Sequence, residues 1–166
     1  MFTLETLSTP IGRVAIATRD GEVWATEFER PGPPLRRFRA EHPDDSFEAP
    51  PEPTPAALAL TRYFADPDTD FSHLGLRLHG SPFELRVWGA LREIPCRETA
   101  SYGWIAKRVG EPNGAQAVGR ANNRNPVPII VPCHRVIGMD GAMIGFGGGL
   151  QRKTWLLDHE QGGRLL

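Results

Sequence analysis

The chain of 166 residues carries a formal net charge of −1, and 40% of its residues are hydrophobic. This length accommodates one large domain or two small ones, with a core that needs no covalent staples. Its apolar runs fall short of the ~20 residues of a membrane span, and its first residues lack the features of a signal peptide. The two distant cysteines, Cys96 and Cys133, do not indicate a disulfide framework, so we expect a cytoplasmic protein without membrane contact.

Charge is distributed unevenly along the chain. Residues 1–75 carry 7 arginines against 13 acidic residues, whereas residues 76–166 carry 12 basic residues against 7 acidic ones. An acidic half joined to a basic half indicates that only the second binds a polyanion. We therefore expect an N-terminal domain over 1–75, a linker over 76–80 and a C-terminal domain over 81–166.

The first half alternates polar and apolar residues as strands do. Residues 2–29 predict strands, and Asp20-Gly21 between two of them is a strong hairpin signal. Residues 31–55 hold half of the prolines among acidic residues, which predicts a surface loop. Helical spacing of apolar residues over 56–64 and alternation over 71–78 then predict one helix and one strand. This half is expected to form a small α/β unit.

The second half begins with helix-capping residues. Ser81 and Glu84 form a capping box that predicts a helix ending near Ile94. A second helix is predicted from Ser101 to Val109 and a third over 115–122, joined by a tight Gly/Pro turn. Such a pair resembles a helix-turn-helix, although many helical hairpins share the pattern. A final helix is predicted over 151–160.

The third predicted helix is narrow. Ala115, Ala117, Gly119 and Ala121 are small residues that allow another surface to approach its backbone closely. Tight packing on a neighbouring helix and insertion into a groove explain this composition equally well.

The run Pro132-Cys133-His134-Arg135 follows an apolar stretch, 129–131, that predicts a buried strand. The proline should end that strand and place Cys133 in the turn after it. A thiol attacks as thiolate, and an adjacent imidazole can supply that state. Taken alone, a single cysteine is more often a small buried hydrophobic residue than a nucleophile.

Several motifs stand in one order and spacing. They are Tyr102, the Ala-x-Ala-Val-Gly helix, Asn125-Pro126, the Val-Pro-Cys-His-Arg-Val run at 131–136, and a glycine-rich run at 145–149 followed by Lys153 and Glu160. Together they resemble the O6-alkylguanine-DNA alkyltransferases, also called methylated-DNA–protein-cysteine methyltransferases. The resemblance covers residues 81–161 and extends loosely to the opening hairpin. It implies a ribonuclease-H-like α/β N-terminal domain and a mainly α C-terminal domain with a winged-helix-like helix-turn-helix.

The same resemblance implies a DNA-repair reaction. An alkyl group of O6-alkylguanine, or more weakly of O4-alkylthymine, would pass irreversibly to Cys133 in a single turnover. Glu160 would orient His134, and His134 would take the thiol proton through a water. We expect the sulfur to be held ionised for this attack. No cofactor is implied because the lesion is the alkyl donor, and no metal is implied because residues 1–75 contain no cysteine.

Other residues would bind the base. Tyr102 would donate its proton toward N3 of guanine, and Asn125 would brace the reactive turn. The carbonyls of Cys133 and Val136 would accept from the exocyclic amine, the Gly147 amide would contact O6, and the Phe146 ring would line the pocket.

Family members insert the second helix of the motif into the minor groove of double-stranded DNA and flip the damaged base out. The DNA-binding residues that this implies here are Ser101, Tyr102, Ala115, Gln116, Ala117, Gly119, Arg120, Asn123, Arg124 and Arg135. We expect a monomer on DNA that bears O6-alkylguanine, and cooperative binding stays open.

Two positions depart from the family pattern. Gln116 stands where an arginine usually enters the base stack, and Phe146 stands where many relatives have tyrosine. We therefore expect weaker binding or flipping, unless Arg120 or Arg124 compensates. The alternatives are a non-catalytic sensor of alkylated DNA, a cysteine hydrolase with turnover, and a purely structural DNA-binding module.

Overall fold

The computed structural model describes residues 1–138, 146 and 148–162. The chain divides into two compact units, Met1–Leu78 and His79–Leu166, and each is described by itself. None of the helices in the described residues is long and apolar enough to cross a bilayer.

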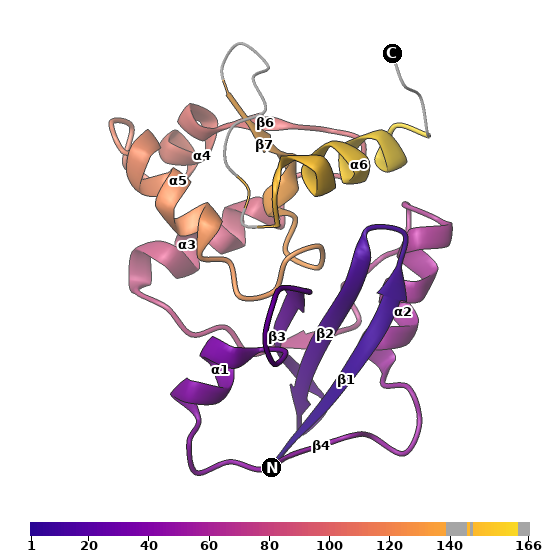
Figure 1. The fold of residues 1–166 in the computed structure, drawn as a ribbon. Coiled ribbons are helices and arrows are strands. Elements are labelled where there is room, and N and C mark those ends of the chain that lie inside the picture. Colours follow the sequence, from indigo (N-terminus) through magenta and orange to yellow (C-terminus); the bar gives the residue numbers. More distant parts are fainter. Residues whose placement is uncertain (139–145, 147, 163–166) are drawn as a thin grey trace. The chain divides into compact units, whose positions relative to one another are not determined.

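A mixed five-stranded sheet forms the N-terminal unit (Figure 1). Its strands are β1 (Phe2–Thr9), β2 (Gly12–Arg19), β3 (Glu22–Phe28), β4 (Phe47–Glu48) and β5 (Gly75–Leu76), in the order β4-β1-β2-β3-β5. The β1–β2–β3 meander is antiparallel, and the two short edge strands pair in parallel. The strand predicted over 71–78 is thus real but confined to two residues.

The β2–β3 hairpin confirms the prediction made from Asp20-Gly21. Both residues have positive φ, 52° and 78°. Two consecutive left-handed residues match the twist of the flanking strands, and glycine adopts this conformation without steric cost.

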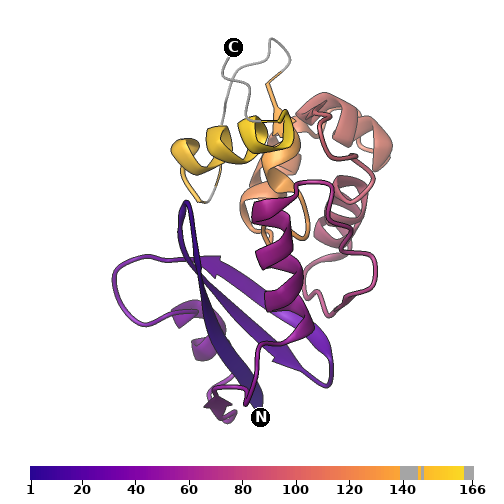
Figure 2. The same cartoon turned by 90° about the vertical axis from the view of Figure 1, so that its right-hand side faces the viewer.

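Helices cover both faces of this sheet. Residues Val14 to Thr18 of β2 are all buried, which requires a layer on each side. Figure 2 shows α2 (Pro55–Ala65) in front of the sheet and α1 (Arg36–Glu41) behind it. The α1 helix lies inside the stretch 31–55 that was predicted to be loop. It forms because Leu35 and Phe38 pack against the alanines of β2 and β3, a contact that local composition does not reveal.

The C-terminal unit is mainly helical. It contains α3 (Pro82–Leu91), β6 (Ala100–Ser101), α4 (Tyr102–Arg108), α5 (Ala115–Asn123), the short 3-10 helix η1 (Cys133–Arg135), β7 (Val136–Ile137) and α6 (Leu150–Glu160). The predicted capping box of Ser81 and Glu84 is present, and Ser101 caps α4. Trp88 is buried and donates its indole N–H to the Ala121 carbonyl at 2.8 Å, which ties α3 to α5.

The predicted strand over 129–131 is wrong. These residues are buried, but Val131 forms only an isolated bridge with Pro128, and Ile129 has a φ of 75°. Pro126 and Pro128 cannot donate to a sheet, and the left-handed Ile129 reverses the chain instead. The mixed α/β fold is confirmed. The ribonuclease-H-like and helix-turn-helix descriptions stay predictions.

Candidate active site

Cys133 begins the 3-10 turn η1 and is 4% exposed. Its amide donates to the Val131 carbonyl at 2.8 Å, and its own carbonyl accepts from the Asn122 amide group at 3.2 Å. Asn125 braces the same segment, because its Nδ2 donates to the Val131 carbonyl at 2.8 Å and its Oδ1 accepts from the Val127 amide at 2.9 Å. The backbone on both sides of the sulfur is therefore fixed by side chains at the end of α5.

Burial raises the pKa of the Cys133 thiol to about 11. A hydrogen bond from Asn125 and the positive charge of Lys153 act in the opposite direction, without overcoming the loss of solvation. The resting thiol is therefore protonated near neutral pH. Burial thus acts against the ionised sulfur that we expected from the sequence, because it favours the neutral thiol.

A buried acid–base array lies immediately after the cysteine. His134 and Glu160 are both 0% exposed, and His134 Nε2 lies 2.6 Å from Glu160 Oε2. Arg135 donates to the same carboxylate through Nε at 2.8 Å and Nη2 at 3.1 Å, and its Nη1 donates to the Ile94 carbonyl at 2.7 Å. The final turn of α6 and the 3-10 turn are thus joined by ionic hydrogen bonds in the interior.

The charges of this array follow from its hydrogen bonds. Burial alone would raise the pKa of Glu160, but the bonds from His134 and Arg135 hold that pKa far below its ordinary range. Burial lowers the pKa of His134, and Glu160 only partly offsets this effect. Glu160 is therefore ionised and His134 neutral near neutral pH.

This arrangement selects the tautomer of His134. Because Nε2 faces a carboxylate that can only accept, Nε2 carries the proton and Nδ1 keeps a lone pair. Nδ1 is buried, and it has no hydrogen-bond partner among the described residues. The imidazole of the residue after Cys133 thus keeps a basic nitrogen without a partner among the described residues, and the carboxylate at Nε2 would stabilise the cation that proton uptake creates.

Lys153 is a buried cation next to the candidate site, and its sequence position alone indicated no role for it. It is 0% exposed, and its Nζ donates to the Val136 carbonyl. Burial lowers its pKa, a negative charge on Cys133 would raise it, and Lys153 in turn lowers the pKa of the thiol. Lys153 precedes Leu156 by three residues and Glu160 by seven, so the three lie on one buried face of α6. This helical spacing is the sequence signal that could have identified it.

Tyr102 is the first residue of α4, and it is half-buried. Burial raises the pKa of its phenol, and a negative charge on Cys133 would raise it further, so the hydroxyl is protonated near neutral pH. Gly119 of α5 lies against the ring, since a Cβ on this glycine would come within 3.8 Å of it. The Tyr102 ring thus packs over Gly119 of α5 at a distance that would still admit a methyl group.

The other predicted base contacts are only partly described. Phe146 is half-buried, and Gly147 lies outside the described residues. The Val136 carbonyl already accepts from Lys153 and, like any carbonyl, can accept one further hydrogen bond.

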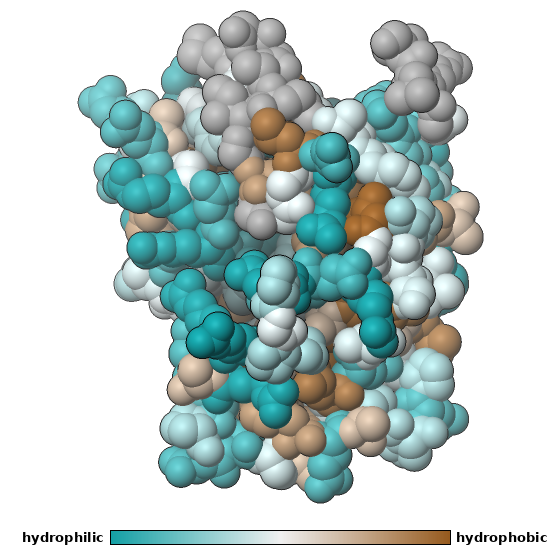
Figure 3. Space-filling model, in the orientation of Figure 1, coloured by the Kyte–Doolittle hydropathy of each residue, from teal (hydrophilic) through white to brown (hydrophobic). Residues whose placement is uncertain are grey.

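The predicted DNA-binding residues divide by exposure. Ala115, Gln116, Arg120, Asn123 and Arg124 are exposed on and just after α5, Ala117 and Gly119 are half-buried, and Ser101 is half-buried at the cap of α4. In Figure 3 the edge that carries α4 and α5 is covered mainly by hydrophilic residues.

Arg135 differs from this set. Its side chain is only 11% exposed, and all its guanidinium nitrogens are engaged with Glu160 and the Ile94 carbonyl. The structure therefore buries this side chain among intramolecular partners, which speaks against the place among the DNA-binding residues that the resemblance implied for Arg135.

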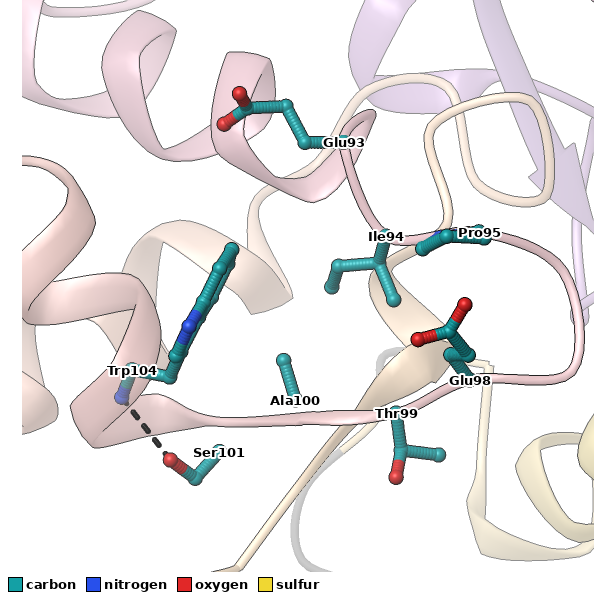
Figure 4. Close-up of a pocket in the computed structure, with 8 residues that line it drawn as sticks. All are labelled: Glu93, Ile94, Pro95, Glu98, Thr99, Ala100, Ser101 and Trp104. Atoms are coloured by element: carbon teal, nitrogen blue, oxygen red, sulfur yellow. Dashed lines mark hydrogen bonds between the residues drawn. The ribbon is translucent and has the colours of Figure 1, made fainter.

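A separate cavity of about 350 Å³ lies between the end of α3 and the start of α4 (Figure 4). The ring of Trp104 and the side chains of Ile94 and Glu98 line it, and Ser101 stands at its edge, where its hydroxyl accepts from the Trp104 amide. Neither Cys133 nor the acid–base array contributes to its wall.

Comparison with known proteins explains this geometry. Residues 82–162 match the family model of the 6-O-methylguanine DNA methyltransferase, DNA binding domain. A methylated-DNA–protein-cysteine methyltransferase of Mycolicibacterium paratuberculosis is 43% identical over 162 residues, which cover 97% of this chain and 93% of that protein. The chain belongs to the methylated-DNA–protein-cysteine methyltransferase family.

Other members are similar in sequence or structure. The Mycobacterium leprae methyltransferase is 56% identical over 106 residues, which span 64% of each chain. The crystal structure of Mycobacterium tuberculosis OGT in complex with DNA superposes with a TM-score of 0.83 at 38% identity, covering 96% of this chain and 93% of that one. In the present chain, residues 82–162, which match the family model, contain every side chain of the Cys133 site.

Proposed function

We propose that this methyltransferase repairs DNA by moving an alkyl group from O6 of guanine to the sulfur of Cys133. Membership of the family carries the activity: the protein is a DNA-repair methyltransferase that binds DNA. The observation that supports Cys133 as the acceptor is the buried His134–Glu160–Arg135 array that directly follows it. Such an array serves a residue that must lose a proton.

The reaction begins with the neutral thiol. His134 takes the proton of Cys133 at Nδ1 through a bridging water, and Glu160 stabilises the resulting imidazolium. The sulfur then displaces O6 from the alkyl carbon, so that a C–S bond forms and the C–O bond breaks. The bonding electron pair passes to the guanine, and the Tyr102 hydroxyl donates a proton toward N3. The product thioether has no good leaving group, so each molecule reacts once.

The route of DNA to this site rests on α4 and α5. Their exposed faces carry polar and basic residues, and the small residues of α5 suit a helix that enters the minor groove. Flipping a base out of the stack costs a few kcal/mol, and it would bring that base to a sulfur buried inside the C-terminal unit.

We further assign the C-terminal unit a winged helix-turn-helix and the N-terminal unit a ribonuclease-H-like fold with a support role. We expect a cytoplasmic monomer, without metal or cofactor, that also repairs O4-alkylthymine weakly.

Intact-mass analysis tests the proposal. The protein is incubated with a duplex oligonucleotide containing O6-methylguanine, and the modified peptide is then mapped. One added methyl per molecule on Cys133, absent in Cys133→Ala, is the expected result. Binding without added mass would replace the proposal with a damage sensor, and repeated turnover would replace it with a hydrolase.

A further inference from the structure

Asn122 connects the exposed helix α5 with the reactive cysteine. It is 2% exposed, and its Nδ2 donates to the Cys133 carbonyl at 3.2 Å. Gln116 and Arg120 of the same helix are exposed. One helix therefore presents polar side chains to solvent on one face and holds the backbone of the cysteine on the other.

Of the two polar atoms in the Asn122 side chain, only Nδ2 makes a hydrogen bond among the described residues. Its Oδ1 is buried and has no hydrogen-bond partner among the described residues. An unsatisfied buried acceptor costs about 1–3 kcal/mol, and an apolar side chain of similar size would avoid that cost. Stability alone is thus a poor reason for an asparagine at this position. The feature that an apolar residue could not supply is the N–H donated to the Cys133 carbonyl.

The position of this carbonyl affects the chemistry. The carbonyl carbon and the Cβ of Cys133 are both bonded to its α-carbon, so hydrogen bonds on both sides of the residue fix that carbon and the direction of its Cα–Cβ bond, from which the sulfur extends. Two hydrogen bonds, from Asn125 to Val131 and from the Cys133 amide to Val131, restrain the N-terminal side of the residue. On its C-terminal side the Val136 amide donates to the Cys133 carbonyl and closes the 3-10 turn, and the bond from Asn122 ties this carbonyl to α5.

We propose that Asn122 is a positioning residue for alkyl transfer: it fixes the Cys133 carbonyl so that the sulfur faces a base delivered by α5. This inference rests on the proposed function and adds a residue that acts through Cys133 rather than on the substrate. In-line displacement depends strongly on geometry, and a misplacement of about 1 Å can reduce a rate by roughly 100-fold.

The test is a single-turnover experiment with Asn122→Leu and Asn122→Ala on duplex DNA containing O6-methylguanine. The reaction amplitude counts the folded molecules, while the rate constant at saturating DNA reports the chemistry, so loss of stability and loss of positioning are separated. Both variants are expected to react about 10- to 100-fold more slowly. Their affinity for unmodified duplex and the reactivity of their Cys133 toward iodoacetamide should stay within about twofold of wild type.

Asn113→Leu is the matched control, since Asn113 is exposed in the turn before α5. It should react at the wild-type rate. Rate constants of both Asn122 variants within twofold of wild type would overturn the inference, and so would slow transfer accompanied by an equal loss of DNA affinity. A wild-type protein that transfers no methyl would instead refute the proposed function.

Discussion

The two units of this chain bury different kinds of side chain. In the N-terminal unit the buried polar residues among those described are Thr18 and Thr26, whereas the C-terminal unit buries the ionisable residues His134, Arg135, Lys153 and Glu160. A buried charge is costly unless it is paired, and even a paired one rarely stabilises more than good apolar packing. The N-terminal unit therefore buries side chains that favour stability, whereas the C-terminal unit bears the energetic cost of buried charges, which the proposed chemistry would account for.

The difference extends to ion pairs. In the N-terminal unit, pairs such as Arg77–Glu22 and Arg37–Glu41 are largely exposed, where water weakens their attraction. In the C-terminal unit, Arg135 and Glu160 meet in the interior. Ion pairs with similar N···O distances should therefore lose very different amounts of stability when one partner is removed.

The largest effect is expected for Glu160→Gln. It leaves Arg135 buried without a counter-charge, which should cost about 3–5 kcal/mol of unfolding free energy, and it removes the carboxylate that stabilises protonated His134. Because folding lowers the pKa of Glu160 below 4.5, its contribution is present above that pH and is lost as the pH falls further. Urea unfolding and single-turnover transfer measure the two effects.

The matched control is Glu22→Gln, which breaks an exposed pair and should cost less than about 1 kcal/mol without slowing transfer. Equal losses of stability in the two variants would remove the distinction between the units.

A substitution that creates a cavity in the N-terminal unit should lower the free energy of unfolding without changing the rate of alkyl transfer. Leu60 of α2 is 0% exposed, and Leu60→Ala is expected to cost about 2–5 kcal/mol. Since no residue of the proposed site lies in this unit, the single-turnover rate constant of the folded molecules should not change. A slower rate constant at full reaction amplitude would show that the N-terminal unit takes part in catalysis.

A smaller effect is expected at the exposed surface of α5. Gln116→Arg adds a cation where the family usually has arginine, so DNA affinity should rise by about 1 kcal/mol and its salt dependence should steepen. Fluorescence anisotropy at several salt concentrations measures both. Unchanged affinity and salt dependence would mean that Arg120 or Arg124 already supplies this contact.

Local signals in the sequence predicted most of the helices. Ser81 with Glu84 marked the start of α3, and Ser101 marked that of α4, because capping is a short-range interaction. The residues 129–131 were misread because an apolar run is typical of both strands and buried turns. The α1 helix was missed because it depends on a packing contact between Phe38 and the sheet.

The site was predictable in its residue types but not in its protonation. The motif around Cys133 indicated a thiol, an imidazole and a carboxylate, and the structure joins the last two. The high pKa of the thiol depends on burial by distant segments, and the role of Asn122 depends on a hydrogen bond across 11 residues. Arg135 was misassigned because its partner, Glu160, lies on another helix.

In the proposed mechanism Cys133 rests as a neutral thiol and gives its proton to His134 only during transfer. A pH titration of thiolate absorbance, taken as the difference between wild type and Cys133→Ala, measures the protonation of this sulfur. The difference signal should be absent at neutral pH and appear only as the pH approaches about 11. A full thiolate signal at neutral pH would mean that the sulfur is already ionised before DNA binds, and the mechanism would be wrong.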